Sequence, residues 1–381
     1  MKRAIASVKL SVASLFCIGA AALLRHRRTT TVGARSRRVW VIGAYGNGNH
    51  GDDSIGISMS GTLRRASFDV MIGARASRIE WLEGSATPHI LVLGTGLRGA
   101  LTSWRIGRTA TTTVLGGGSL LVGKHDSNGI LITGIPYLLN FVMAGLAGSR
   151  LVVHGIDVPA VPYPNRIAAR AVRDVLRAAE SVAVRDALSQ RVLEGYGVKA
   201  TLVRDPASVL FAEWALERVH SDSIGVVLLD QYRWPTFSRG SDSLEAQRAN
   251  DLNKVAEEVL RDRLPSDHIR LFSFHWSDTG IVNDFSQLLL ARGVAEADIT
   301  RVPYMLSPQR VFVALMSCRV VHSMRFHPAL AALISGCEVR THNSVQKIDE
   351  IVRFGRDAEG HWAYPQDFHD PEVVLLAACC D

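Results

Sequence analysis

The segment VWVIGAYGNGNHGDDSIGISMSGTL, residues 39–63, sets the pattern that much of the chain repeats. Its first four residues are β-branched, aromatic or aliphatic and predict a strand. A turn rich in glycine and asparagine follows, and Ile55, Met59 and Leu63 then recur at helical spacing. A strand, a glycine-rich turn and an amphipathic helix make one βα unit. Repetition of this unit predicts a parallel sheet covered by helices.

The same alternation runs through the first half of the chain. Short β-branched runs predict further strands at residues 68–72, 90–93, 113–115, 151–153, 181–184 and 201–203. Apolar residues at helical spacing are clearest at 167–179 and 188–196.

A second series follows and predicts another doubly wound sheet. Its strands are expected at 224–229, 269–272, 299–302, 320–322 and 338–340. Its helices are expected at 244–264, 282–292, 308–318 and 328–334.

The length of 381 residues exceeds the size at which a single hydrophobic core usually stops growing. We therefore expect an α/β protein of two Rossmann-like, doubly wound domains that face a cleft. The polar stretch 213–222 is the expected linker. This divides the chain into a leader at 1–37, domains at 38–215 and 222–355, and a C-terminal tail at 356–381.

Composition excludes several classes of function. The net charge of +7 comes partly from basic residues near the N-terminus, and no stripe of Lys and Arg is interleaved with aromatic residues, so nucleic acid is not an expected partner. The five cysteines form no C-x-x-C pair, which predicts reduced thiols in a cytoplasmic protein. The thirteen histidines include no H-E-x-x-H pattern, so we expect no metal.

The apolar run LSVASLFCIGAAALL, residues 10–24, lies between basic residues. It is shorter than the roughly 20 residues that span a bilayer, and Arg25 follows it where a signal peptide would need small residues. We expect it to attach the protein to the cytoplasmic face of a membrane. A dispensable leader is the alternative.

The turn after the first strand is the first candidate ligand site. It offers glycine backbone, amide and carboxylate groups at a helix N-terminus, where anions bind; these residues are Gly46, Asn47, Gly48, Asn49, Gly51 and Asp52. The sequence is neither a Rossmann G-x-G-x-x-G nor a P-loop. A tight turn with an aspartate N-cap is the structural alternative.

Two further candidates end predicted strands. One is the run Gly116, Gly117, Gly118 and Ser119. It is expected at the carboxyl edge of the sheet, where ligands bind, although close packing explains such glycines equally well. Arg185 is expected at the same edge, either as an anion-binding residue or in a buried ion pair with Asp186.

The segment Ser323-Met324-Arg325-Phe326-His327-Pro328 is the most informative one. It follows a predicted strand, and Pro328 is expected at the first position of a helix, which makes His327 the expected N-cap. A histidine at a helix N-terminus is favoured in its neutral form, which exchanges protons readily near neutral pH. Arg325 could hold a carboxylate or phosphate with two parallel hydrogen bonds.

Taken in order, these segments resemble the motifs of the polysaccharide pyruvyl transferase family. The matching motifs are GAYGNGNHGDDSI at 43–55, VLGGGSLL at 114–121, VAVRDALSQRVLEGYGV at 182–198, VRDPASVL at 203–210 and HSMRFHPALAAL at 322–333. The resemblance covers about residues 39–352. It implies a fold like the GT-B glycosyltransferases, phosphoenolpyruvate as donor, and a glycan or lipid-linked sugar as acceptor.

The resemblance also assigns roles to individual residues. It implies that His327 is the proton donor or relay, that Arg325 and Arg185 hold the carboxylate and phosphate, and that the glycine loops and Ser323 contribute to the substrate site. Lys347 is the nearest match to a lysine of the last motif. The scheme requires no cofactor and no metal.

The sequence departs from the family pattern near Pro328 and Lys347, so two alternatives remain open. One is a GT-B glycosyltransferase that uses a nucleotide sugar, because one fold serves many functions. The other is a non-catalytic, glycan-binding relative.

Overall fold

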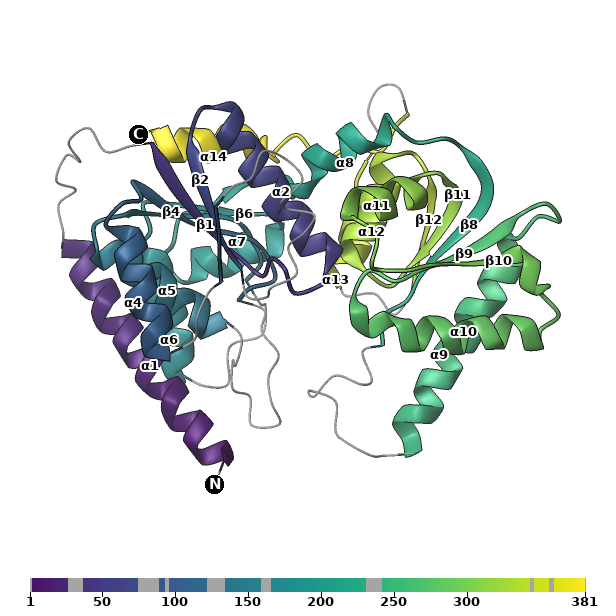
Figure 1. Ribbon diagram of the computed structural model, residues 1–381, viewed down its shortest axis with the longest axis horizontal. Helices are drawn as coiled ribbons and strands as arrows, with labels where there is room; N and C mark the ends of the chain where they lie inside the picture. The colour runs from purple at the N-terminus through teal and green to yellow at the C-terminus, as the bar shows by residue number, and fades with distance from the viewer. Residues whose placement is uncertain are drawn as a thin grey trace. The chain divides into compact units, whose positions relative to one another are not determined.

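The computed structural model describes residues 2–26, 37–74, 89–92, 96–121, 134–158, 166–230, 242–342, 346–355 and 360–380. The chain divides into two compact units (Figure 1). Unit 1 contains Met1–Asn47, Ile55–Pro206 and Asp367–Asp381. Unit 2 contains Gly48–Ser54 and Ala207–Gln366.

Unit 1 is built on a parallel, seven-stranded sheet in the order β3-β2-β1-β4-β5-β6-β7. Its strands are β1 (Arg38–Ile42), β2 (Asp69–Ala74), β3 (His89–Val92), β4 (Thr112–Gly118), β5 (Arg150–Ile156), β6 (Ser181–Val184) and β7 (Thr201–Leu202). The central strands β1 and β4 are apolar and buried along most of their length, as expected for a sheet covered on both faces.

Helices cover both faces of this sheet. On one side lie α1 (Lys2–His26), α4 (Gly96–Gly107), α5 (Gly134–Leu146) and α6 (Arg166–Ala178), and on the other lie α2 (His50–Arg65) and α14 (Pro371–Cys380) (Figure 1). The short helix α7 (Ala187–Gly195) joins β6 to β7. Helix α1 packs on α5 and α6 and therefore forms an outer layer of unit 1.

Unit 2 repeats this plan with a parallel, five-stranded sheet in the order β10-β9-β8-β11-β12. Its strands are β8 (Ser221–Val227), β9 (His268–Phe272), β10 (Ile299–Val302), β11 (Cys318–Ser323) and β12 (Glu338–Thr341). Its helices are α8 (Ala207–Ala215), α9 (Asp242–Asp262), α10 (Thr279–Ala291), α11 (Pro308–Met316), α12 (Phe326–Ile334) and α13 (Gln346–Val352).

Strand order reverses once in each sheet. In unit 1 the chain moves from β1 outward to β3 and then returns to β4, beside β1. In unit 2 it moves from β8 to β10 and returns to β11, beside β8. In open α/β sheets such a reversal leaves a crevice at the carboxyl ends of the two central strands, which is where ligands bind. Ligand-binding residues are therefore expected in the segments that follow β1, β4, β8 and β11.

The structure confirms the predicted fold class and every predicted strand, but the units divide at a different place. We expected the linker at 213–222, whereas the main segment of unit 2 begins at Ala207 with α8. Phe211 and Trp214 of α8 pack against Phe312 of α11, a long-range contact that no local pattern indicates. The stretch 356–381, expected to be a tail, contains α14, which returns to unit 1.

Candidate functional site

The reversal point of unit 2 brings Arg325 beside the end of β8. Arg325 lies two residues beyond β11, and its Nε donates to the backbone oxygen of Leu228, just beyond β8, at 3.3 Å. Ser323, the last residue of β11, fixes the turn through its hydroxyl, which accepts from the Arg325 backbone N–H at 3.2 Å and donates to the Arg325 carbonyl at 2.9 Å. The strand end and its turn therefore hold the arginine in one place.

Helix α12 begins earlier than the sequence pattern indicated. The N-cap is Arg325, so His327 is the second helical residue and Pro328 the third. The expected N-cap role of His327 is therefore wrong. Proline still falls within the first turn, where its missing N–H has no helical partner to lose. His327 remains at the positive end of α12, only 7% exposed.

Asp278 is the acidic partner of Arg325, and sequence analysis did not identify it. Its carboxylate forms an ion pair with the Arg325 guanidinium and also accepts from the backbone N–H groups of Phe274 and His275 at 3.1 and 2.9 Å. Burial raises the pKa of Asp278, while the charge and hydrogen bond of Arg325 act in the opposite direction. The carboxylate thus links Arg325 to the turn that follows β9.

The first turn of α2 completes this cluster, and it belongs to unit 2. His50 donates its backbone N–H to the carbonyl of Phe274 at 3.1 Å, and Asn49 forms an isolated antiparallel bridge with His275. The Asn49 side chain accepts from the Gly51 N–H at 3.2 Å and donates to the Asp52 carboxylate at 2.7 Å. Asn49 therefore caps the start of the helix.

Two glycines allow close approach at this point. A Cβ on Gly51 would lie 2.2 Å from Nδ1 of His327, so only glycine lets the first turns of α2 and α12 meet. Gly48 has a positive φ of 73°, and a Cβ there would lie 3.1 Å from the indole of Trp276. Trp276 is 60% exposed although it is large and apolar.

His50 is a second histidine of the site that sequence analysis missed. It is fully buried and packs edge-on against Phe274, with ring centroids 6.1 Å apart. The pKa of His50 is lowered to about 4, mainly by burial and to a smaller extent by the charge of Arg325, whereas a backbone hydrogen bond with Tyr304 acts in the opposite direction. His50 is therefore neutral near pH 7.

The unit 1 glycines are explained by packing. Cβ atoms on Gly116 and Gly117 would lie 2.6 Å from Met59 and 2.0 Å from Ile55, two residues of α2, and Tyr45 donates its hydroxyl to the Gly116 carbonyl at 2.7 Å. Gly117 and Gly118 have positive φ values of 67° and 80°. The alternative of close helix–strand packing thus accounts for Gly116 and Gly117.

Arg185 lies in a buried ion network of unit 1. Its side chain is 2% exposed and forms ion pairs with Asp157 and Asp205, while Ser119 donates its hydroxyl to Asp157 at 2.6 Å. The two carboxylates raise the pKa of Arg185 further above its usual value, although burial opposes them. The expected pair with Asp186 does not form, because Asp186 accepts from Ser189 as the N-cap of α7.

The structure thus places the candidate residues in separate groups. Gly48, Asn49, Gly51 and Asp52 join Ser323, Arg325 and His327 in unit 2. Gly46 and Asn47, in the turn before α2, belong to unit 1 with Gly116–Ser119 and Arg185. Lys347 lies in α13, and its side chain is outside the described residues.

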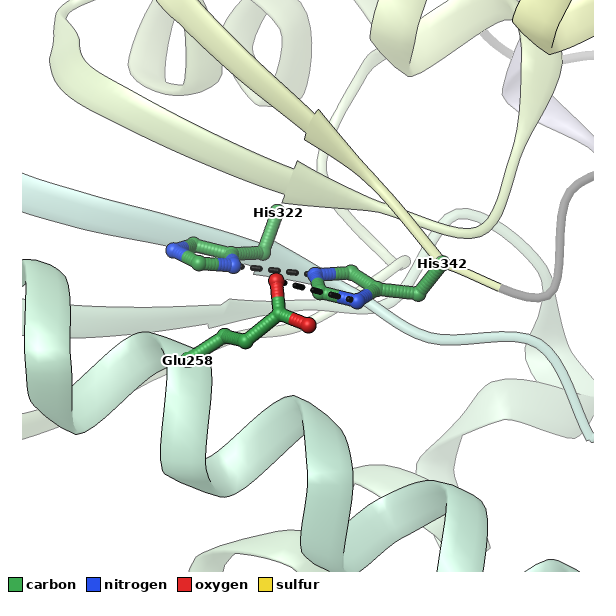
Figure 2. Close-up of side chains that lie close together, drawn as sticks. All are labelled: Glu258, His322 and His342. Carbon is green, nitrogen blue, oxygen red and sulfur yellow. Dashed lines mark hydrogen bonds and ion pairs between the residues drawn. The ribbon is translucent and has the colours of Figure 1, made fainter.

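One further cluster, Glu258, His322 and His342, could hold a metal, because their ligand atoms lie within 4.8 Å of one another (Figure 2). However, Nδ1 of His322 and Nε2 of His342 are 2.9 Å apart, and the ring planes differ by only 10°. Tetrahedral zinc with bonds of about 2.0–2.1 Å would hold two nitrogens about 3.3–3.4 Å apart, so the rings would have to separate to bind zinc in that geometry. Burial lowers the pKa of both histidines, that of His322 to about 3. The geometry fits a neutral imidazole pair joined by one hydrogen bond.

Solved structures with a similar fold cover nearly the whole chain. HepE of Anabaena in complex with UDP-glucose is 14% identical, with a TM-score of 0.52, and the match covers 90% of this chain and 88% of that one. The UDP-GlcNAc 2-epimerase of Methanocaldococcus jannaschii is 10% identical, with a TM-score of 0.55 and coverage of 90% and 92%. MnaA of S. aureus with UDP is 9% identical, with a TM-score of 0.55 and coverage of 90% and 86%. These likenesses show a GT-B-like fold of two Rossmann-like domains.

Sequence comparison gives a more specific result. No curated protein matches the chain. The family model described as Polysaccharide pyruvyl transferase matches residues 49–341. That match begins at the Asn49 cap of α2 and ends with β12, so it contains the cluster around Arg325 and His327 except Gly48.

Proposed function

Because this chain belongs to the polysaccharide pyruvyl transferase family and is thus a transferase, we propose that it transfers pyruvate as a ketal from phosphoenolpyruvate to a sugar. The acceptor is a sugar of a cell-surface polysaccharide or of its lipid-linked precursor. The observation that carries the proposal is the meeting of Arg325, His327 and the α2 N-terminus at the reversal point of the unit 2 sheet.

The reaction needs a proton donor and anion binding. The methylene carbon of phosphoenolpyruvate gains a proton and becomes a methyl group, and two sugar hydroxyls form C–O bonds to the neighbouring carbon as the bond to phosphate breaks. Of the two hydroxyl protons lost, one balances the proton gained by the methyl carbon and the other leaves with phosphate. The developing positive charge on the ketal carbon lies beside the donor carboxylate.

His327 is the proposed proton donor, because it is a titratable group at the α12 N-terminus and lies against the first turn of α2. Arg325 is the proposed anion-binding residue. Its guanidinium is held by Asp278 and Leu228, so its position is fixed before the donor binds. The N-terminus of α2 adds a partial positive charge at the same place.

Arg185 has a different role in this proposal from the one that the family resemblance implied. Its charge is balanced by two buried carboxylates, so it holds β4, β5 and β6 together at their carboxyl ends rather than binding the donor. Trp276 is the proposed acceptor contact, because its exposed ring lies beside Gly48, where the apolar face of a sugar can pack against it.

Ligand binding distinguishes this function from its alternatives. Thermal unfolding should shift upward with phosphoenolpyruvate, because a ligand that binds only the folded state stabilises it. A shift with UDP or GDP and none with phosphoenolpyruvate would favour a nucleotide-sugar enzyme, and a shift with glycan alone would favour a binding protein.

Three variants separate the proposed roles. His327→Gln should keep donor binding and lose turnover by about 100- to 10,000-fold. Arg325→Ala should weaken donor binding, and Arg325→Lys should restore it only in part because an ammonium group cannot form the bidentate contact. All three variants must unfold near the wild-type temperature for this test to be valid. Full transfer by His327→Gln would mean that the histidine is structural.

A further inference from the structure

Helices α1, α4, α5 and α6 lie together on one side of unit 1 (Figure 1). Helix α1 is the outermost of them, and it packs on α5 and α6 through small residues spaced along one face. These buried residues are Ser14, Cys17, Ala20 and Ala21. The predicted apolar run at 10–24 is therefore a surface helix of unit 1, folded against its neighbours.

The opposite face of α1 is apolar and exposed to solvent. Val12, Leu15, Phe16 and Leu23 are 61%, 57%, 44% and 67% exposed. Their spacing of three, four and seven residues aligns them along one side of the helix. Single exposed apolar residues are common, but a stripe of large ones indicates a surface that binds another protein or a membrane.

Other helices on this side of unit 1 also expose large apolar residues. Leu101 and Trp104 of α4 are 49% and 38% exposed, and Ile167 of α6 is 38% exposed. Tryptophan is enriched where proteins meet the polar boundary of a bilayer, because its ring is apolar and its N–H is polar.

The same helices carry charge of one sign. The sequences of α1, α4 and α5 contain no Asp or Glu, and the single acidic residue of α6, Asp174, is buried. Exposed arginines lie in or directly after α1, α4 and α6; they are Arg25, Arg98, Arg105, Arg108, Arg166, Arg170 and Arg177. Of these, Arg170 pairs with Asp174, and Arg177 donates to the Tyr196 carbonyl. By contrast, α2 and α14 on the other side of the sheet both carry acidic residues.

We propose that this surface, which we call the α1 face, docks on the anionic surface of a lipid bilayer. An apolar stripe beside exposed arginines matches the acyl boundary and the phosphate groups of such a surface. Because α1 packs on α5 and α6, we place it along the bilayer surface. Among the described residues no helix is long and apolar enough to cross a membrane. The inference rests on unit 1 alone and does not depend on the donor proposed above.

Charge also argues against a second copy as the occupant. A two-fold interface would place arginines of one α1 face against arginines of the other, and like charges in contact oppose association. An anionic bilayer carries the opposite charge, so this repulsion does not arise there.

The test is flotation of full-length protein with vesicles of phosphatidylcholine alone or mixed with phosphatidylglycerol. Binding should require the anionic lipid and weaken as salt is raised. The double variant Leu15→Ser/Phe16→Ser should lose binding at least tenfold, because it removes two apolar side chains from the stripe. Each of Arg98→Gln and Arg105→Gln should weaken it about fivefold. The matched control is Val373→Ser on α14, which is 67% exposed and should bind like the wild type.

The remaining outcomes would overturn the proposal. These are no flotation with anionic vesicles, flotation that Leu15→Ser/Phe16→Ser leaves unchanged in a folded protein, or equal loss with Val373→Ser. If the wild type sediments as a dimer that Leu15→Ser/Phe16→Ser dissociates, and does not float, the α1 face is an interface between copies.

Discussion

Replacing Gly51 by alanine tests the contact between α2 and α12. The new Cβ would lie 2.2 Å from Nδ1, 2.7 Å from Cγ and 3.0 Å from Cβ of His327. Non-bonded heavy atoms settle at roughly 3.5–4.0 Å, so the imidazole must retreat by about 1 Å. Its own Cβ is part of the crowding, which means that side-chain rotation alone cannot relieve it.

This displacement should lower both the stability and the reaction rate of the variant. Crowding of this kind destabilises a protein by about 1–3 kcal/mol. A catalytic group moved by about 1 Å can lose about 100-fold in rate. Because Gly51 does not have a positive φ, backbone strain does not add to these costs.

Gly61→Ala is the matched control on the same helix. The nearest atom to its new Cβ is the flexible end of Arg65, at an ordinary 3.5 Å. This variant should be more stable than the wild type by about 0.5–1 kcal/mol and equally active. Urea unfolding and transfer rates of both variants are the assay. If Gly51→Ala transfers pyruvate as fast as Gly61→Ala does, His327 does not act from the position described.

Two further predictions concern charge. The lowered pKa of His50, about 4 against about 6.5 when unfolded, contributes stability that is present above pH 6.5 and is lost as pH falls through 4. The contribution is about 3 kcal/mol. The difference in unfolding free energy between wild type and His50→Gln should therefore shrink on acidification. A difference that stays constant with pH would contradict the lowered pKa of His50. Arg185→Met should destabilise the fold by about 3–5 kcal/mol because it leaves Asp157 and Asp205 buried without their partner. Normal stability combined with lost donor binding would instead make Arg185 a ligand residue.

The fold could be predicted from the sequence because each strand is indicated by residues that are neighbours in the sequence. Each strand of the two sheets is a short β-branched run, and the glycine turns mark where strands end. The order of strands is not local, however. It takes the structure to show that β8 and β11 are neighbours, which brings Leu228 and Arg325 together across 97 positions of sequence.

The candidate site was only partly predictable for the same reason. Arg325, His327 and Gly51 lie where a strand is followed by a helix, in segments that glycine, proline and charged residues make recognisable. His50 and Asp278 belong to the site because of long-range contacts. His50 packs against Phe274, and Asp278 pairs with Arg325, and both partners are far away in sequence. A buried aspartate just before a helix gives no pattern that separates it from an ordinary cap. The long-range partners of Arg185 were missed in the same way.

The proposed function gives this protein phosphoenolpyruvate as its donor and His327 as its proton source. The direct measurement is phosphate release from phosphoenolpyruvate together with ketal formation on glycan and lipid-linked acceptors, for wild type and His327→Gln. We expect equal amounts of phosphate and ketal from the wild type. The variant should still bind the donor but form both products far more slowly. Transfer from a nucleotide sugar with none from phosphoenolpyruvate, or full activity in His327→Gln, would contradict it.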